Sequence, residues 1–198
     1  YTLKGRSVAV ISNGTAVLGL GDIGAFGSLP VIEGKALLHK SFAGTDAYPI
    51  AIDATDKDEI VSVIKAISPG FAGIHLEDIK APECFYIEDK LKEVLDIPVY
   101  HDDQHGTAIS VLAGLYNGLR IVNKNIEDIK VVIDGAGASG IAIANLLLSA
   151  GVKDIVLCDI NGALIEGDKS LNKAQEKIAK LTNRNFETGY IEDLIKGK

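Results

Sequence analysis

The sequence lacks several features that would place it in particular classes of protein. It has no methionine and no tryptophan, and only two cysteines and five prolines in 198 residues. Cys84 and Cys158 are far apart and form no CxxC motif, which favours reduced thiols in a cytoplasmic protein over a disulfide framework. Because the chain starts at Tyr1 and contains no methionine, we expect it to be part of a longer polypeptide.

Positive charge is also scarce. Lysine and arginine number 20 against 27 acidic residues, so the net charge is -7. Phosphate contacts need clustered basic side chains, so we expect neither a nucleic-acid nor a membrane-surface partner. The chain has no apolar run of the roughly 18 residues that span a membrane and no signal-peptide pattern. With 47% hydrophobic residues, it is expected to fold as a soluble globular protein that binds a small molecule.

Short β-rich runs alternate with segments of helical periodicity along the chain. This alternation is typical of a mostly parallel α/β architecture. The expected strands are Ser7–Ser12, Tyr48–Ile52, Gly73–Leu76, Pro98–Tyr100, Lys130–Ile133 and Asp154–Cys158. The expected helices are Lys57–Ile67, Cys84–Leu95, Gly106–Val122 and Ser139–Ala150, with Asp56 as the N-cap of the first.

Glycine, with 21 residues, is abundant, and the pattern GxGxxG occurs twice. The copy at Gly135–Gly140 follows an expected strand and opens an expected helix, and Asp159 lies 19 residues after Gly140. In a Rossmann unit such a loop approaches a pyrophosphate, and the later acid accepts hydrogen bonds from the ribose. We assign to this nucleotide site Gly135, Gly137, Ala138, Ser139, Gly140 and Asp159.

Two points qualify this nucleotide site. A glycine-rich turn that only packs a helix closely on a sheet would show the same pattern. If a dinucleotide binds, Asp159 repels a 2′-phosphate and therefore favours NAD over NADP. The other glycine copy, Gly19–Gly24, has no acid at the right distance, and Ala25–Pro30 is not expected to begin a helix. We interpret it as a substrate loop.

Acidic pairs follow two of the expected strands. Glu77 and Asp78 come directly after Gly73–Leu76, and Asp102 and Asp103 come after the strand that ends at Tyr100. Ligands of open α/β sheets bind beyond the carboxyl ends of the strands, so the two pairs can converge on one crevice. Carboxylate oxygens suit Mg²⁺ or Mn²⁺. A solvated loop or a helix cap is the alternative for either pair alone.

Lys35 lies in an otherwise apolar segment, Gly34–Leu38, which is expected to begin a helix. Burial there would lower the pKa of the amine and make it a usable base. The alternative is a surface lysine whose stem packs on apolar neighbours while its charge stays in water.

We divide the chain into two parts. Residues 1–105 form a partial parallel-sheet domain for substrate and metal, and residues 106–198 form a partial Rossmann-type dinucleotide-binding domain with helix 106–122 as connector. A polar stretch at residues 123–127 separates that helix from a new strand and marks a boundary. The second domain has too few strands for a complete doubly wound sheet and is expected to be truncated.

Five blocks of this sequence, taken together and in this order, resemble malic enzymes of the shorter prokaryotic type. These blocks are Ser12–Gly24 (SNGTAVLGLGDIG), Glu33–Leu38 (EGKALL), Leu76–Ile79 (LEDI), His101–Ala108 (HDDQHGTA) and Gly135–Gly140 (GAGASG). The resemblance covers essentially the entire chain.

The resemblance implies an activity and a role for each candidate residue. It implies a homodimer that oxidatively decarboxylates malate to pyruvate and CO₂ while reducing NAD, with NADP less favoured. Lys35 would be the general base and Asp102 a further catalytic residue beside the metal site. The ligands of Mg²⁺ or Mn²⁺ would be Glu77, Asp78 and Asp103, and the loop Gly135–Gly140 with Asp159 would hold NAD.

The sequence departs from the family pattern at three places. Asn13 stands where members of this type usually have aspartate, and Ala16 stands where the larger malic enzymes have an arginine for the substrate carboxylate. The family's tyrosine block, similar to YTPG, and its C-terminal substrate segment are absent, so the chain resembles an internal portion of the enzyme.

Two other functions stay open. One is a metal-independent Rossmann dehydrogenase of another hydroxy or amino acid, which would leave both acidic pairs without a role. The other is a nucleotide-binding module without turnover, which the absence of the tyrosine block allows.

Overall fold

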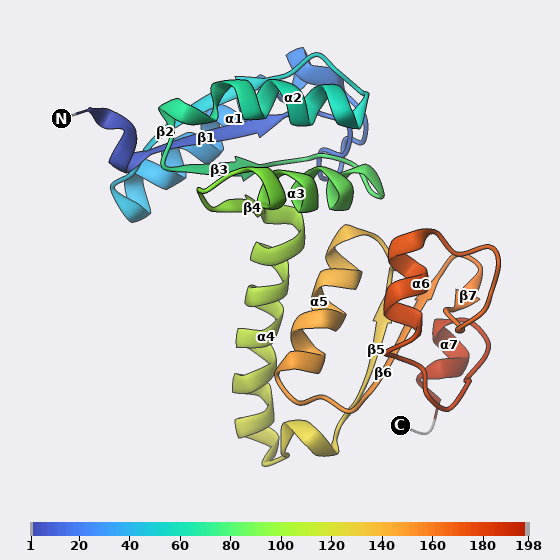
Figure 1. Ribbon diagram of the computed structural model, residues 1–198. Coiled ribbons are helices and arrows are strands. Elements are labelled where there is room, and N and C mark those ends of the chain that lie inside the picture. Colours follow the sequence, from blue (N-terminus) through green and yellow to red (C-terminus); the bar gives the residue numbers. More distant parts are fainter. Residues whose placement is uncertain (1, 197–198) are drawn as a thin grey trace. The chain divides into compact units, whose positions relative to one another are not determined.

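The computed structural model describes residues 2–196 and divides into two compact units between Asp102 and Asp103 (Figure 1). Residues 1 and 197–198, the outermost ends of the two expected domains, lie outside the described residues. The first unit contains η1 (Leu3–Arg6), β1 (Ser7–Ser12), α1 (Gly24–Leu38), η2 (His39–Ala43), β2 (Asp46–Ala51), α2 (Lys57–Ile67), η3 (Ser68–Gly70), β3 (Gly73–Leu76), α3 (Glu83–Val94) and β4 (Val99–His101). The second contains α4 (Asp102–Val122, whose first residue closes the first unit), η4 (Ile126–Asp128), β5 (Lys130–Asp134), α5 (Ala138–Ser149), β6 (Asp154–Asp159), β7 (Gly162–Ala163), α6 (Lys173–Ala179) and α7 (Ile191–Leu194).

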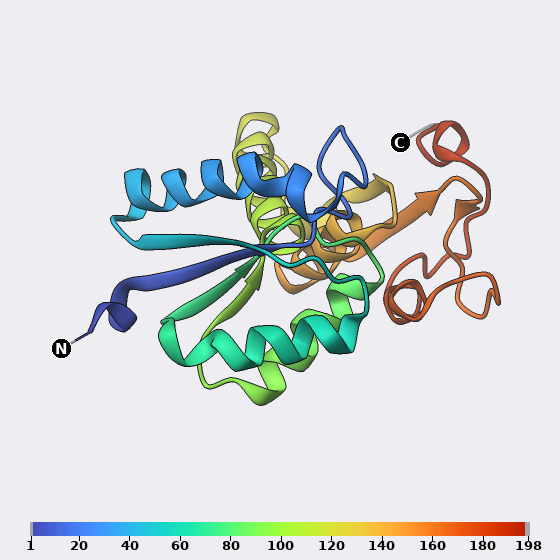
Figure 2. The ribbon, with the colours of Figure 1, turned by 90° about the horizontal axis from the view of Figure 1, so that it is seen from above.

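The first unit is built on a parallel sheet in the order β2-β1-β3-β4. The chain passes from β1 to β2 on one side and then crosses to β3 on the other side of β1. Helix α1 covers one face of the sheet, and α2 and α3 cover the other (Figure 2). Ligands of such sheets bind beyond the carboxyl ends of the strands where the order reverses. The candidate crevice therefore lies beyond Ser12 and Leu76, the last residues of β1 and β3.

The core of this unit follows from its apolar periodicity. In β1, Ala9, Val10 and Ile11 are buried, as expected for a strand covered on both faces. Helix α2 buries Ile60 and Ile64, one turn apart, and each fully buried isoleucine contributes about 1.5–3 kcal/mol. The expected N-cap of α2 is confirmed, because the Asp56 carboxylate accepts hydrogen bonds from the first-turn backbone N–H groups of Asp58 and Glu59.

The expectation that Ala25–Pro30 cannot begin a helix is wrong. Helix α1 begins at Gly24 and contains Pro30 in its interior. Proline lacks the N–H that would bond the carbonyl four residues earlier, at a cost of about 3 kcal/mol. Helix α1 buries Ala25, Ser28, Ile32 and Ala36. This stripe follows helical spacing, and its packing outweighs the lost hydrogen bond. Lys35 consequently lies in the last turn of a helix and not at the start of one.

The second unit holds a three-stranded sheet in the order β5-β6-β7. Strands β5 and β6 are parallel, as expected, whereas β7 pairs antiparallel with β6. The expected helix at residues 106–122 begins earlier, at Asp102, so the second acidic pair lies in the first turn of α4. The other expected helices and strands are confirmed, with ends shifted by at most two residues.

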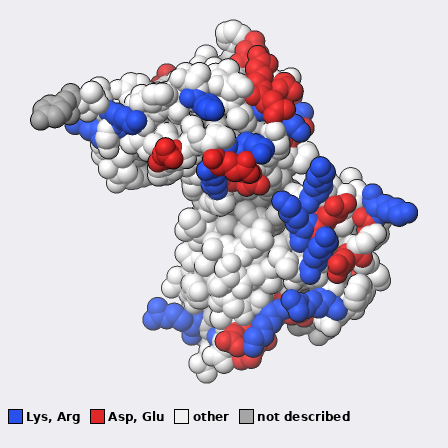
Figure 3. Space-filling model, viewed as in Figure 1, with Lys and Arg blue, Asp and Glu red and all other residues white. Residues whose placement is uncertain are grey.

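Charges of both signs are distributed over the visible face of each unit (Figure 3). Helix α4 presents a mostly uncharged surface there, since residues 104–119 contain no lysine, arginine, aspartate or glutamate. Among residues 2–196, none of the helices is both long and apolar enough to cross a membrane.

Candidate active site

The register between β3 and β4 aligns the two acidic pairs. His75 pairs with Tyr100 and Leu76 pairs with His101, so the next residues in each strand direction are Glu77 and Asp102. Residues two apart in a strand point to the same face. The acids at the strand ends are therefore expected on the face that carries His75 and Tyr100.

Lys35 lies between two of these acids. Its Nζ donates a hydrogen bond to Asp102 Oδ2 at 2.7 Å and lies 3.1 Å from Glu77 Oε1. The lysine side chain is 23% exposed and that of Glu77 is 8% exposed. Helix α1 thus places the ammonium group of Lys35 at the carboxyl ends of β3 and β4. There the ammonium contacts both carboxylates, and the three side chains form one charged network.

The pKa of Lys35 moves opposite to the expectation. Burial of the amine lowers its pKa, as expected, but the hydrogen bond to Asp102 and the charge of Glu77 raise it, and the net shift is upward. For Asp102, burial raises the pKa of the carboxyl, but hydrogen bonds from Lys35 and Tyr100 outweigh it, and the net shift is downward. Both shifts favour the ion pair.

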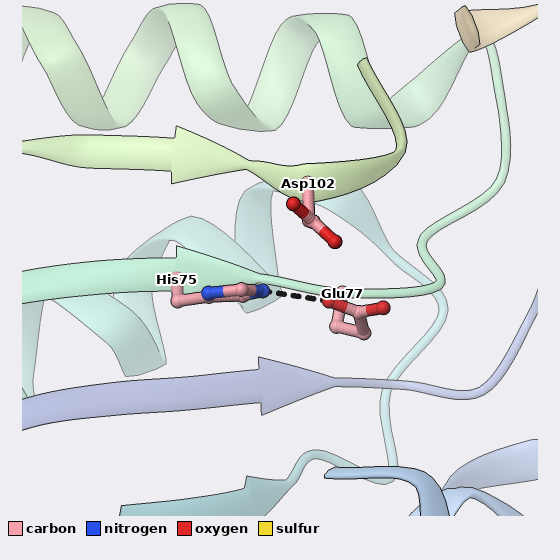
Figure 4. A group of neighbouring side chains, drawn as sticks. All are labelled: His75, Glu77 and Asp102. Atoms are coloured by element: carbon pink, nitrogen blue, oxygen red, sulfur yellow. Dashed lines mark hydrogen bonds and ion pairs between the residues drawn. The ribbon is translucent and has the colours of Figure 1, made fainter. Parts of the chain in front are cut away.

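Two further side chains extend this network, and the sequence analysis missed both. The Tyr100 hydroxyl donates to Asp102 Oδ1 at 2.5 Å. His75 Nε2 lies 2.6 Å from Glu77 Oε2, and Figure 4 shows this contact with Asp102 nearby. The signal that could have found them is the two-residue spacing to each acid within an expected strand.

Asp78 places a second buried carboxylate beside Glu77. The two residues are 3% and 6% exposed, and each offers an oxygen within 4.8 Å of the other. Asp78 adopts a left-handed backbone with φ of 54°, and its carbonyl accepts a hydrogen bond from the Ala16 N–H at 3.0 Å. Strained non-glycine residues of this kind cluster at functional sites.

The positive charge that balances these carboxylates can come from a metal ion or from a lysine side chain. His75, Glu77 and Asp102 also offer ligand atoms within 4.8 Å of one another. In that group, however, Lys35 already supplies the positive charge to both carboxylates. Glu77 also belongs with Asp78 to a second group of acids, whose carboxylate oxygens are donors that suit Mg²⁺ or Mn²⁺. Asp103, the other expected ligand, follows Asp102 in the chain and is the first residue of the second unit.

The first glycine block organises the loop after β1. Asn13 donates from Nδ2 to the carbonyl of Ala54 at 3.1 Å, and its Oδ1 accepts from the Thr15 hydroxyl at 2.8 Å. Gly14 has a φ of 67°, and a Cβ there would lie 2.1 Å from the carbonyl oxygen of Gly24. These contacts give the block a structural role. The substrate-loop interpretation stays a prediction.

In the second unit, the second glycine block joins β5 to the start of α5. A Cβ on Gly140 would lie 1.8 Å from the carbonyl oxygen of Gly135, so only glycine fits there without backbone movement. A Cβ on Gly137 would meet no atom within 4 Å. Close packing therefore explains Gly140 but not Gly137, whose assignment to the nucleotide site stays a prediction.

The other expected nucleotide residues lie near this loop. Asp159 ends β6 and accepts hydrogen bonds from the Asn161 N–H at 2.7 Å and from Gln175 Nε2 at 3.3 Å. Gln175 Nε2 also lies 3.4 Å from the carbonyl of Ala136, so this side chain, which the sequence analysis missed, spans from the loop to Asp159. The Ser139 hydroxyl donates to the carbonyl of Asp103 at 2.8 Å.

Two protein-family models match the chain, one in each unit. Residues 2–92 match the model of the malic enzyme N-terminal domain, and residues 104–196 match the model of the malic enzyme NAD-binding domain. The chain belongs to the malic enzyme family.

Individual malic enzymes match closely over much of the chain. This chain is 55% identical to the NAD-dependent malic enzyme of Geobacillus stearothermophilus over 99% of the chain's length. It is also 55% identical to the NADP-dependent malic enzyme of Escherichia coli over 90% of the chain's length. The crystal structure of the NAD-dependent malic enzyme of Thermotoga maritima superposes with a TM-score of 0.96 at 47% identity, covering 100% of this chain. The chain spans 41%, 24% and 53% of these proteins, respectively.

Most candidate residues lie in one or the other of the two segments that match malic enzyme domains, residues 2–92 and 104–196. Lys35, Glu77 and Asp78 lie in the segment that matches the N-terminal domain. The loop Gly135–Gly140, Asp159 and Gln175 lie in the segment that matches the NAD-binding domain. Asp102 and Asp103 lie in the short connection between the two matched segments.

Proposed function

We propose that the protein catalyses the oxidative decarboxylation of malate to pyruvate and CO₂ with reduction of NAD, and that the reaction depends on a divalent metal. The observation that carries this proposal is the position of Lys35, whose Nζ lies 2.7 Å from Asp102 and 3.1 Å from Glu77 at the carboxyl ends of β3 and β4. The same chain carries both domain models of the malic enzyme family.

The donor atoms of the site fit Mg²⁺ or Mn²⁺. Glu77 and Asp78 are buried side by side, and a cation shared by both carboxylates would reduce the repulsion between them. Both ions prefer carboxylate oxygens, and we assign Asp103 as the third ligand because it directly follows Asp102 in the chain. A divalent ion held by these residues would supply Lewis-acid chemistry: polarisation of the C2 oxygen of malate and stabilisation of the enolate charge left by departing CO₂.

We assign Lys35 as the base that accepts the proton of the C2 hydroxyl of malate. The two neighbouring carboxylates hold the amine in its protonated form here. Sharing the charge of Glu77 with a cation would lower the pKa of Lys35, whose partly exposed ammonium could then release its proton to solvent water. The neutral amine would then accept the hydroxyl proton. Asp102, itself fixed by the Tyr100 hydroxyl, keeps Nζ oriented toward the carboxyl ends of the strands.

NAD is the dinucleotide that the second unit favours over NADP. Relatives named as NAD-dependent and as NADP-dependent both match this chain, and the residues of the second unit support the choice of NAD. Asp159 ends β6 after a glycine loop that opens α5, the position from which a carboxylate binds ribose hydroxyls and repels a 2′-phosphate. Gly137 leaves open space beside the loop backbone.

We further assign residues 1–105 to substrate and metal and residues 106–198 to the dinucleotide, and infer that the protein acts as a homodimer. The separate matches of residues 2–92 and 104–196 support this division. The family resemblance supports the homodimer, which sedimentation of the intact protein tests. The net charge of -7 favours neither a nucleic acid nor a membrane surface as a partner.

Turnover by the intact protein tests the proposed function. NADH formation from malate with Mn²⁺ is expected, and EDTA should abolish it. Activity that survives EDTA would instead identify a metal-independent dehydrogenase. Binding of NAD without turnover of malate would identify a nucleotide-binding module.

Replacing Asp159 with alanine is expected to weaken discrimination against NADP. The substitution removes the negative charge that a 2′-phosphate would meet at the end of β6. The ratio of kcat/KM with NAD to kcat/KM with NADP measures the effect. Asp154→Ala, at the other end of the same strand, is the matched control. An unchanged ratio in Asp159→Ala would show that this carboxylate does not face the ribose.

Two substitutions in the second glycine block should separate folding from binding. Gly140→Ala is expected to destabilise the protein by about 1–3 kcal/mol or more, because its Cβ would overlap the Gly135 carbonyl. Gly137→Ala should leave the free energy of unfolding unchanged, since its Cβ enters open space, and should weaken NAD binding. Urea unfolding and NAD titration measure the two effects. Unaltered NAD affinity in Gly137→Ala would contradict a pyrophosphate at this loop.

A further inference from the structure

We propose that His75, held in turn by His39, is a positioning residue that fixes the rotation of the Glu77 carboxylate. The inference rests on the proposed function, in which Glu77 is a metal ligand. His75 lies in β3, and His39 is the first residue after α1. Neither histidine belongs to the metal ligands or the proton-transfer residues assigned above.

Both ring nitrogens of His75 are engaged by other side chains. Nε2 lies 2.6 Å from Glu77 Oε2, and Nδ1 lies 2.9 Å from Nε2 of His39. His75 is 5% exposed, and its ring packs edge-on against those of His39 and Tyr100, with centroid separations of 5.0 and 5.4 Å. The imidazole therefore has a single orientation set from three sides.

The contact with Glu77 defines the direction of one of these hydrogen bonds. An ionised carboxylate only accepts, so the His75 Nε2 must carry a proton and donate it toward Glu77. The other ring nitrogen of His75, Nδ1, shares a second hydrogen bond with Nε2 of His39. Nδ1 of His39 faces the Thr45 hydroxyl at 3.4 Å.

This arrangement assigns different partners to the two oxygens of Glu77. Oε2 faces His75, whereas Oε1 faces the ammonium of Lys35 at 3.1 Å. A carboxylate held at both oxygens cannot rotate freely, so Oε1 stays on the side where Lys35 and Asp102 lie. Outer partners of this kind orient metal ligands, and their loss typically lowers metal affinity by about 10–100-fold.

Mn²⁺ affinity of the intact protein tests the inference without any need for turnover. The dissociation constant is measured from the electron paramagnetic resonance signal of unbound Mn²⁺. His75→Phe keeps a ring but loses both nitrogens, and it is expected to weaken Mn²⁺ binding by about 10–100-fold with NAD affinity unchanged. His75→Gln should recover most of the affinity, because its amide N–H can still donate toward Glu77. His39→Phe should give a smaller loss.

Two parallel variants make the outcomes distinguishable. Tyr48→Leu removes a comparable edge-to-face contact, with Phe71 at 6.0 Å, and should bind Mn²⁺ normally. Glu77→Gln should lose Mn²⁺ binding, and unchanged affinity there would overturn the metal site itself. Wild-type affinity in His75→Phe, with binding lost in Glu77→Gln, would overturn the role of His75. If His75→Phe does not fold, His39→Phe replaces it as the test, because His39 is only half-buried. Unchanged Mn²⁺ affinity in His39→Phe would then overturn the proposal.

Discussion

Replacing Lys35 with alanine is expected to lower kcat for malate oxidation in the intact protein by roughly 10²–10⁴, the usual contribution of a positioned proton-transfer group. The Lys35 nitrogen lies within 3.1 Å of both carboxylates, and Lys35 is the base that we assign to the C2 hydroxyl proton. Steady-state kinetics with malate measures the loss. Decarboxylation of added oxaloacetate, which does not need that proton removed, should be affected less.

Lys40→Ala provides the matched control for this substitution. Lys40 lies in η2, two residues after the end of α1, and pairs with Asp46 at 2.7 Å, but its side chain is 59% exposed. It should retain normal kcat. A Lys35→Ala protein that unfolds at lower temperature, yet has normal kcat in its folded fraction, would show that Lys35 is structural.

Replacing Asp103 with alanine is expected to abolish metal-dependent turnover while NAD affinity stays within a few-fold. The substitution removes one of three proposed metal ligands, so the loss of Mn²⁺ affinity should exceed the roughly 10–100-fold typical of outer partners. The dinucleotide residues follow other strands, β5 and β6, so their affinity should not depend on this carboxylate. Mn²⁺ and NAD titrations measure the two affinities separately.

Loss of an acid from a first helical turn has its own effect on helix stability, and Glu59→Ala controls for it. Glu59 lies in the first turn of α2 and is exposed. Its substitution should change stability by the same small amount as Asp103→Ala and leave Mn²⁺ binding intact. Equal loss of Mn²⁺ and NAD binding in folded Asp103→Ala would contradict separate sites.

The strands and their acids could be predicted because the signals are local. Glu77 and Asp102 directly follow apolar runs with turn residues at their boundaries, and parallel strands bring such ends to one edge. The nucleotide loop could be predicted for the same reason, since strand, glycines, helix and Asp159 all lie within about 30 residues, the length of one βαβ unit.

Helix α1 and the partners of Lys35 could not be predicted from local signals. Proline and glycine within residues 24–30 disfavour a helix locally, and only packing against the sheet outweighs them. The direction of the Lys35 pKa depends on Asp102, which lies 67 residues away in the chain. Burial alone could be anticipated from the apolar neighbours, and burial alone gives the opposite sign.

The Lys35 to Asp102 contact has a consequence for folding. It closes a loop of 67 residues, and the contact between His39 and His75 closes one of 36. The entropy lost on closing a loop must be offset by contacts that form only when distant segments meet, which makes such pairings slow to form. The acids and the lysine therefore come together only after β1, β3, β4 and α1 have assembled. A partly folded chain would carry all of these residues and still lack the arrangement, so binding of Mn²⁺ would report completed folding of the first unit.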